Sequence, residues 1–366
     1  MKVDGRWRRA IEVADDGRTI VVLDQVKLPY EVAWLALDDL EGVERAIREM
    51  HVRGAPLIGA AAAYGVVFGL RAGLPLDVVD RRLAATRPTA VNLRWALDAM
   101  RAALTADGAR PDAERAWAVA GTIADEEVAR CEAIGDHGVA LLEQAARGRA
   151  GTGRDTVHVL THCNAGWLAT VDWGTALAPI YKAHERGLAV HVWVDETRPR
   201  NQGMLTAWEL AAHGVPHTVV ADNAGGHLMQ HGQVDLCIVG TDRTTRDGDV
   251  CNKIGTYLKA LAAHDNGVPF YVAAPSPSID WRVRARDIPI EERAADEVRW
   301  VAGVGGTRAQ VVPAASNVAN PAFDVTPRRL VTAIITERGV AAPDALAAQF
   351  PEHAGAPGGE PTRERR

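Results

Sequence analysis

The sequence lacks the features typical of nucleic-acid-binding, secreted and membrane-spanning proteins. Its 366 residues carry a formal net charge of −6, whereas a surface that binds nucleic acid or an anionic membrane needs a basic excess. Residues Met1 to Ile11 carry charges and no apolar signal segment. The longest apolar run, Ala55–Leu70, is too short for a typical membrane span and indicates a buried helix. We therefore expect a cytoplasmic protein without a nucleic-acid or membrane partner.

Cysteine is also scarce. The chain has four cysteines, Cys131, Cys163, Cys237 and Cys251, and no two of them form a C-x-x-C pair. No histidine lies at zinc-finger spacing from any of them, so the sequence predicts no structural metal site. In the cytoplasm the thiols are expected to be reduced.

What is present indicates a globular chain of two domains. Hydrophobic residues make up 47% and charged residues 24%, which is sufficient for a core. Apolar residues recur at three- and four-residue spacing in the first part of the chain, which predicts helices there. These helices are expected at Glu41–Arg53, Ala55–Leu70, Leu76–Thr86, Asn92–Ala106 and Asp112–Ala146, after a strand at Arg18–Leu23. We expect a mainly helical domain with short strands over residues 1–147.

The periodicity changes after a Gly/Arg-rich segment at residues 146–154, which is interpreted as a linker. Short β-branched runs then alternate with helical stretches, a pattern typical of a parallel sheet covered on both faces. The predicted strands are Thr156–Thr161, Ala189–Val194, His217–Ala221, Leu236–Val239 and Phe270–Ala273. The predicted helices are Trp173–Arg186, Met204–His213, Gly225–His231 and Lys253–His264. The fold class is therefore α/β, with a Rossmann-like doubly wound domain over residues 155–345 and a disordered tail over 353–366.

Polar or reactive residues follow the predicted strands. Doubly wound sheets bind ligands outside the carboxyl ends of their strands. Cys163 follows the first strand and Asp242 follows the fourth. A lone cysteine is more often an inert buried residue, but backbone N–H groups at a strand-to-helix junction favour a thiolate at Cys163. An aspartate at a strand end is often a helix N-cap, whereas a desolvated carboxyl at Asp242 would serve as a general acid.

Two predicted helix starts carry groups suited to phosphate. Arg53 and Gly54 precede the Ala/Gly-rich helix, with Pro56 in its first turn, and a helix N-terminus beside a guanidinium binds anions. Asn252 and Lys253 precede another predicted helix. The alternative for each basic residue is an ordinary surface charge. A glycine-rich run near Gly303 does not complete a dinucleotide fingerprint, so a nicotinamide cofactor is not expected.

Several motifs together resemble the methylthioribose-1-phosphate isomerases. They are Arg53–Gly59, Arg87–Leu93, Thr161–Gly166, Asp195–Pro199, Gly248–Tyr257, Ile288–Arg293 and Asn320–Pro327. The resemblance covers about residues 20 to 340. It implies a homodimeric aldose–ketose isomerase of methionine salvage that acts on a sugar phosphate without metal or organic cofactor. The implied catalytic pair is Cys163 and Asp242, and the implied substrate-binding residues are Arg53, Gly54, Ala55, Arg94, Gln202, Asn252 and Lys253.

The resemblance also implies the chemistry. The phosphate on the anomeric oxygen keeps the sugar ring closed, so an acid must open it, and Asp242 is the expected acid. Hydrogen then moves from C2 to C1, with Cys163 either as the base of a proton transfer or as part of an apolar wall for a hydride shift.

Two segments depart from the common pattern of this family and leave the substrate open. They are Asp222–His227 and Gly240–Thr245, which border the expected site. A 5-deoxyribose 1-phosphate or another pentose 1-phosphate is therefore an alternative substrate. A different alternative is a non-catalytic protein like the regulatory subunits of the eukaryotic translation-initiation exchange factor. A ribose 1,5-bisphosphate substrate would need a second basic pocket, which the sequence does not clearly supply.

Overall fold

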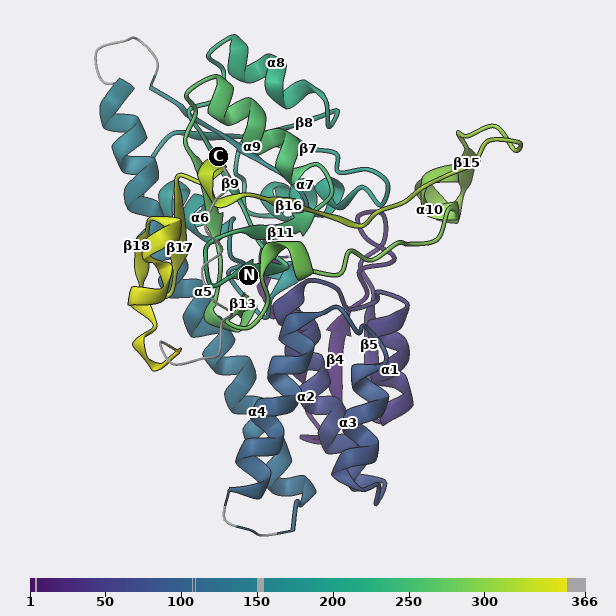
Figure 1. Cartoon of the computed structure of the whole chain (residues 1–366). Helices are drawn as coiled ribbons and strands as arrows, with labels where there is room; N and C mark the ends of the chain where they lie inside the picture. Colours follow the sequence, from purple (N-terminus) through teal and green to yellow (C-terminus); the bar gives the residue numbers. More distant parts are fainter. Residues whose placement is uncertain (4, 107, 109, 150–154, 354–366) are drawn as a thin grey trace.

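The computed structural model describes residues 1–3, 5–106, 108, 110–149 and 155–353 (Figure 1). The N-terminal part combines a three-stranded antiparallel sheet, in the order β3-β4-β5, with a group of helices. Its strands are β1 (Lys2–Val3), β2 (Arg6–Trp7), β3 (Ile11–Val13), β4 (Ile20–Leu23) and β5 (Trp34–Leu37). Its helices are α1 (Leu40–Arg48), α2 (Ala55–Arg71), α3 (Leu76–Ala84), α4 (Val91–Thr105) and α5 (Ala113–Arg149).

Local sequence explains where these helices begin. Asp39 caps α1, because its carboxylate accepts a hydrogen bond of 2.6 Å from the backbone N–H of Gly42. Helix α2 begins after Gly54 and has Pro56 in its first turn, as predicted. Nearly all of its residues are buried against other helices of the protein. None of the helices in the described part of the chain is long and apolar enough to cross a membrane.

Helix α5 connects the two parts of the molecule. It packs against α2 in the first part and against α6 (Ala178–Glu185) in the second. Gly138 permits the close approach to α6, since a Cβ there would lie 2.4 Å from Cγ of Pro179. The helix runs to Arg149, so the first residues of the expected linker are helical. The rest of that linker, residues 150–154, and the expected tail after His353 lie outside the described residues.

A seven-stranded sheet forms the centre of the second part, and it confirms the predicted doubly wound fold. Its strands are β6 (Val157–Thr161), β7 (Val190–Asp195), β8 (His217–Val220), β9 (Leu236–Val239), β12 (Phe270–Ala273), β17 (Ala333–Thr336) and β18 (Gly339–Ala341). They lie in the order β18-β17-β12-β9-β6-β7-β8, and all neighbours are parallel except β17 and β18. Its other helices are α7 (Gln202–Ala212), α8 (Ala224–Gln230) and α9 (Thr256–Asp265).

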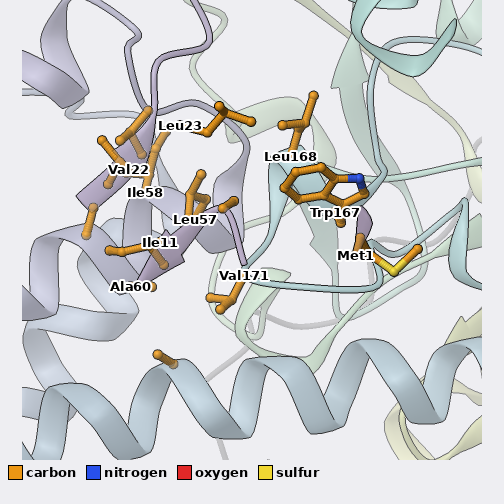
Figure 2. Close-up of a cluster of buried hydrophobic side chains, with 14 of the residues drawn as sticks. Met1, Ile11, Val22, Leu23, Leu57, Ile58, Ala60, Trp167, Leu168 and Val171 are labelled. Carbon is orange, nitrogen blue, oxygen red and sulfur yellow. The ribbon is translucent and has the colours of Figure 1, made fainter. Parts of the chain in front are cut away.

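Side chains of β6 alternate between the two faces of this sheet. Val159 belongs to the core that includes α5 and α6, and Leu160 belongs to the core beneath α8 and α9. The first core extends into the N-terminal part, where side chains of β3, β4 and α2 meet the segment after β6 (Figure 2). The residues labelled there are Met1, Ile11, Val22, Leu23, Leu57, Ile58, Ala60, Trp167, Leu168 and Val171. The two parts therefore share a continuous apolar core.

A second, four-stranded sheet was not predicted from the sequence. It has the order β13-β10-β11-β16, with β10 (Arg243–Thr245), β11 (Val250–Lys253), β13 (Ile279–Asp280) and β16 (Phe323–Thr326). A further segment, with α10 (Asp296–Arg299) and the hairpin β14 (Trp300–Ala302) and β15 (Arg308–Gln310), extends to one side of the molecule (Figure 1). The glycine-rich run near Gly303 lies in this hairpin.

Candidate active site

The candidate site lies where the order of strands in the large sheet reverses. From β6 the chain builds outward through β7 and β8, and then returns to place β9 on the other side of β6. The loops after β6 and β9 therefore diverge and leave a crevice at the carboxyl ends of the strands. Cys163 follows β6, Asp242 follows β9, and both line the same pocket.

Most of the residues predicted from the sequence meet in this pocket. Its walls come from the start of α2, the loops after β6 and β9, the start of α7, and the end of β11. The predicted residues that line it are Arg53, Gly54, Ala55, Cys163, Gln202, Asp242, Asn252 and Lys253. Segments far apart in the sequence thus contribute to one cavity.

Cys163 lies on a loop with a constrained backbone. Its φ is 66°, its N–H donates to Oγ1 of Thr197 at 2.9 Å, and its carbonyl accepts from Oγ1 of Thr206 at 2.8 Å. No helix begins at this residue, because the next helical turn starts at Trp167. Burial raises the pKa of the Cys163 thiol, although nearby Arg53 and other cations oppose that shift. The direction of this shift favours the neutral thiol over the thiolate expected from the sequence.

Strained backbone is concentrated around this site. Met50, Thr197 and Asn201 share the left-handed conformation of Cys163, with φ between 56° and 66°. Thr197 hydrogen-bonds to Cys163, and Met50 lines the pocket. Left-handed non-glycine residues are uncommon and tend to occur at functional sites.

Asp242 is presented to the pocket by a short connection between β9 and β10. Its backbone N–H donates to the carbonyl of Cys251 at 3.1 Å. The following residues form a strand, so Asp242 does not cap a helix. Within the described residues its carboxyl has no hydrogen-bond partner. Burial raises the pKa of this carboxyl, with Lys253 and Arg87 acting in the opposite direction. A carboxyl in that state is suited to donate a proton near neutral pH.

The start of α2 provides one cationic wall. The Nη2 of Arg53 donates to both oxygens of Asn164, at 2.9 Å to Oδ1 and 3.0 Å to the carbonyl. Its Nη1 is buried with no partner among the described residues, and it remains available to a ligand. Gly54 has a φ of 92°, and a Cβ there would lie 2.3 Å from the carbonyl oxygen of Ala169. Only glycine fits between the helix start and that loop.

Lys253 provides the opposite cationic wall. It ends β11, opposite Phe323 of β16, so it does not open a helix as predicted. Helix α9 begins later, at Thr256. The Lys253 ammonium donates to the carbonyl of Ala322 at 3.1 Å and lies 4.6 Å from the centre of the Phe323 ring. Burial lowers the pKa of this ammonium.

Two amide side chains complete the polar surface. Asn252 donates from Nδ2 to Oγ1 of Thr256 at 3.1 Å and lines the pocket beside Lys253. Gln202 lies in the first turn of α7, and its Oε1 is buried with no partner among the described residues. Like Nη1 of Arg53, this atom can bind a polar ligand.

Arg94 is not brought to the pocket. Its guanidinium contacts Asp80 at 2.6 Å and Asp98 at 2.9 Å on the surface of α4. Arg87, from the same sequence motif, lines the pocket instead and pairs with Glu291 at 3.3 Å. The Arg94 side chain is 43% exposed and that of Arg87 only 13%. Both arginines were visible in the sequence, but only the folded chain distinguishes them.

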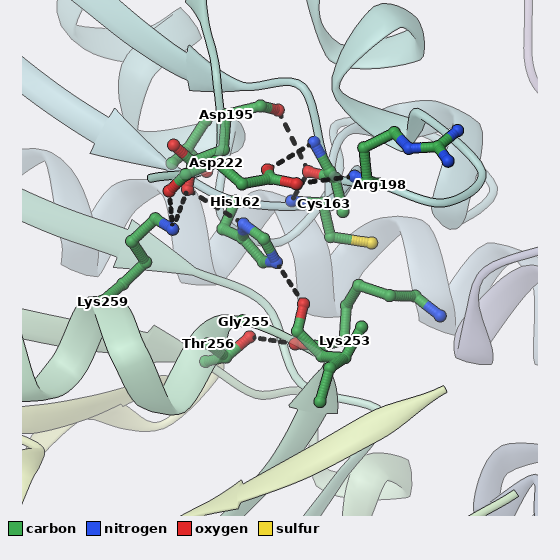
Figure 3. A network of polar contacts seen from close by, with 12 residues as sticks. His162, Cys163, Asp195, Arg198, Asp222, Lys253, Gly255, Thr256 and Lys259 are labelled. Carbon is green, nitrogen blue, oxygen red and sulfur yellow. Dashed lines mark hydrogen bonds and ion pairs between the residues drawn. The ribbon is translucent and has the colours of Figure 1, made fainter. Parts of the chain in front are cut away.

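A buried polar network supports the pocket from behind (Figure 3). His162 contacts Asp195 through Nδ1 at 2.9 Å and the carbonyl of Ile254 through Nε2 at 2.8 Å. The contact between His162 and Ile254 joins the loop carrying Cys163 to the turn after Lys253. The side chains of His162, Asp195 and Asp222 form a cluster in which one potential metal-ligand atom of each lies within 4.8 Å of the others. The Lys259 ammonium already lies 3.1 Å from Asp195 and would repel a metal cation there.

Comparisons with known proteins show the family of this chain. Residues 51–343 match the initiation factor 2 subunit family. Methylthioribose-1-phosphate isomerase from Rhodospirillum rubrum is 59% identical over 98% of this chain and 95% of its own length. The enzyme of that name from Escherichia coli O45:K1 is 55% identical over 96% of both chains.

Solved structures show the same relationship. The crystal structure of 5-methylthioribose 1-phosphate isomerase from Pyrococcus horikoshii superposes with a TM-score of 0.81 at 37% identity, covering 95% of this chain and 96% of that one. A structure described as translation initiation factor eIF-2B subunit delta from A. fulgidus gives 0.76 at 39% identity, covering 95% and 99%. The chain belongs to the initiation factor 2 subunit family, in the group formed by the methylthioribose-1-phosphate isomerases.

Proposed function

We propose that this protein is an aldose–ketose isomerase that converts 5-methylthioribose 1-phosphate into 5-methylthioribulose 1-phosphate. The observation that carries the proposal is a pocket in which Asp242 and Cys163 meet between the cations of Arg53 and Lys253. This is the arrangement that a phosphorylated sugar needs when its ring must be opened by an acid. The close relatives named for this reaction support the choice of substrate.

The first step is opening of the ring. Asp242 donates a proton to the ring oxygen as the bond between C1 and that oxygen breaks. Burial raises the pKa of this carboxyl, which favours the protonated form that this step needs. The hydroxyl at C2 loses its proton when the ketone forms, so a proton gained at the ring oxygen is balanced by one released at C2. The ionised Asp242 is the group we assign to recover it.

The second step moves hydrogen from C2 to C1. A neutral thiol at Cys163 cannot accept a proton, and a bound phosphate dianion would disfavour its thiolate further. This supports a hydride shift, in which hydrogen leaves C2 with its electron pair and Cys163 forms part of the surrounding wall. The proton-transfer route would instead require the thiolate.

The phosphate is assigned to the cationic side of the pocket. Arg53 offers its unpartnered Nη1, the start of α2 at Gly54 and Ala55 offers backbone N–H groups, and Arg87 and Lys253 add charge. Arg87 takes the place expected for Arg94. The sugar hydroxyls are assigned to the side-chain amides of Gln202 and Asn252.

A neighbouring pocket with a largely apolar wall supports a substrate with a methylthio group at C5. It adjoins the first through Met50, Arg53 and Gln202, which line both. Its other apolar lining residues are Val26, Leu28, Pro29, Tyr30, Pro199, Met204, Leu205, Trp300 and Ala302. Burying a thioether against these apolar side chains is favourable, although the polar residues Gln25, Arg200, Asn201 and Glu297 also line the pocket. A 5-deoxyribose 1-phosphate would fit but fill less of this space.

The wider context is part of the same proposal. The reaction belongs to methionine salvage, and we place it in the cytoplasm with the protein as a homodimer. The structure from A. fulgidus described as a translation-factor subunit keeps the non-catalytic alternative in view. Purified protein that turned over none of these sugar phosphates would favour that alternative.

Turnover of three substrates tests the proposal. Purified protein is given 5-methylthioribose, 5-deoxyribose and ribose 1-phosphates, and ketose formation is followed for each. The expected order of kcat/KM is methylthio, then deoxy, then ribose, with about tenfold or more between the first and the last, as a single apolar group typically contributes. Equal values, or a preference for ribose 1-phosphate, would contradict the substrate assignment.

A further inference from the structure

A buried carboxylate, that of Glu209, lies directly behind Asn164, which lines the pocket. Glu209, on α7, is fully buried and accepts four hydrogen bonds. Its Oε1 accepts from Nδ2 of Asn164 at 2.8 Å and from the N–H of Leu168 at 3.1 Å. Its Oε2 accepts from the N–H of Trp167 at 2.9 Å and the hydroxyl of Tyr181 at 3.0 Å. None of the steps described above uses this group.

The four donors explain how a carboxylate persists at this depth. Burying a charge without partners is costly, and burial raises the pKa of Glu209 to about 7 even with these hydrogen bonds. The loop is fitted closely around it, since a Cβ at Gly166 would lie 1.8 Å from Oε2. An apolar side chain would fill such a position at lower cost if packing were its only role.

The geometry connects Glu209 to Arg53 through Asn164. The amide nitrogen of Asn164 donates to Glu209, which leaves Oδ1 facing Nη2 of Arg53 at 2.9 Å. If that amide were reversed, its NH₂ group would face the guanidinium, and Arg53 would lose an acceptor. Glu209, with Oγ1 of Thr206 as a second and longer acceptor of the same Nδ2 at 3.2 Å, therefore fixes which end of Asn164 meets Arg53. The orientation of Asn164 in turn affects the direction in which the free Nη1 points.

We propose that Glu209 is a positioning residue for the phosphate-binding arginine, acting through the side chain of Asn164. The inference rests on the proposed function, in which Arg53 binds the substrate phosphate. Glu209 holds Asn164, Asn164 holds one amino group of Arg53, and the other amino group binds phosphate. The residue acts on binding of the phosphate and leaves the acid at Asp242 in place.

The test uses inorganic phosphate as the probe, with its Kd measured by calorimetry and KM and kcat measured with the sugar phosphate. In Glu209→Gln the new amide brings an NH₂ group against at least one donor. We expect Kd for phosphate and KM to rise at least ~10-fold, with kcat changed less than ~3-fold, because a lost hydrogen bond to a charged group has this scale. The matched control is Glu127→Gln, another buried glutamate, on α5, outside the pocket. It should leave both constants unchanged.

A double-mutant cycle tests the route through Asn164. If Glu209 acts through that amide, Asn164→Ala weakens phosphate binding, and adding Glu209→Gln weakens it by less than ~2-fold more. Additive effects, or a wild-type Kd in folded Glu209→Gln, would overturn the inference. If that variant does not fold, Glu209→Asp keeps the charge but withdraws it from Asn164. A Kd weaker by ~3-fold or more would then support the inference, and an unchanged Kd would overturn it.

Arg53→Met separates this inference from the function on which it rests. A loss of phosphate affinity in Arg53→Met but not in Glu209→Gln would defeat only the positioning role. Unchanged phosphate affinity in Arg53→Met would defeat the assignment of Arg53 itself.

Discussion

At the scale of single residues, burial shifts the two proposed catalytic groups toward their neutral forms. It raises the pKa of the Asp242 carboxyl and of the Cys163 thiol, and the cations around the pocket only partly oppose this. A neutral carboxyl can donate a proton, whereas a neutral thiol cannot accept one. The same physical cause thus favours the proposed role of Asp242 as an acid and disfavours Cys163 as a base.

The fate of the hydrogen at C2 tests the state of Cys163. With Cys163 as a thiol we expect a hydride shift, so the product formed in D₂O should carry no solvent deuterium at C1. The measurement is NMR or mass spectrometry of the ketose at early conversion. Deuterium at C1 in a large share of the product would show proton exchange and return Cys163 to the role of base.

Two arginines of one sequence motif form a matched pair for mutation. Arg87→Met removes a cation from the pocket, so we expect kcat/KM to fall ~10²-fold or more, mainly through KM, as expected for a lost charged contact. Arg94→Met removes a partly exposed ion pair with Asp80 outside the pocket, so kcat/KM should stay within ~2-fold of wild type. Steady-state kinetics of both variants test this prediction. The reverse pattern would restore Arg94 as the substrate-binding arginine expected from the sequence.

This pair also shows what the sequence could not provide. Arg87 begins the motif that ends in Leu93 and Arg94 directly follows it, and nothing in their local pattern separates them. The difference arises from tertiary contacts, since Arg87 pairs with Glu291, 204 residues away, and Arg94 pairs with Asp80 of the preceding helix α3. Asn164 and Glu209 were missed for the same reason, because their connection depends on the packing of α7 against the loop after β6.

At the scale of elements, regular and strongly patterned segments were predictable. The apolar run of α2 and its start at Gly54 and Pro56 were read correctly from the sequence. The second sheet was missed, because β11 ends in the buried polar residues Asn252 and Lys253, which do not resemble a strand. Its strands are short, and their pairing with distant segments such as β16 decides their structure.

The substitution Gly54→Ala tests whether the close contact between the start of α2 and Ala169 shapes the pocket. In Gly54→Ala the new Cβ would meet Ala169 in a backbone conformation that L-residues avoid. We expect kcat/KM to fall ~10-fold or more and stability to fall by about 1–3 kcal/mol.

Gly73→Ala is the matched control for that variant. Gly73 also has a positive φ, of 77°, but open space around its Cβ position. Its stability should fall by about 1 kcal/mol while kcat/KM stays at the wild-type value. Normal catalysis in Gly54→Ala would show that the close contact with Ala169 does not shape the pocket.

At the scale of the whole molecule, the fold class followed from the alternation of strands and helices, and the structure confirms it. The strand order could not be read in the same way, because it depends on the return of the chain from β8 to β9 beside β6. That return creates the crevice between Cys163 and Asp242. The site is thus a consequence of topology as well as of motif.

A buried glutamate is also expected to make the stability of the whole molecule depend on pH. Burial raises the pKa of Glu127 from 4.5 to about 7. A group with a raised folded pKa stabilises the protein fully below its unfolded pKa, and this contribution is lost as pH rises toward 7. Glu127→Gln removes that dependence. Relative to wild type, the variant should therefore gain on the order of 3 kcal/mol between pH 4 and pH 8.

Urea unfolding of both proteins across this range measures the difference. The free energies of unfolding should diverge as pH rises, in favour of the variant. A difference that stays constant with pH would mean that Glu127 titrates in the folded protein as it does in the unfolded chain.

The central claim is that Asp242 is the acid that opens the sugar ring, and Asp242→Asn tests it most directly. The carboxamide has nearly the same size but cannot donate a proton in the same way. We expect kcat for 5-methylthioribose 1-phosphate to fall ~10³-fold or more, while the Kd for substrate stays within ~3-fold of wild type. A wild-type kcat in a folded Asp242→Asn variant would contradict the account.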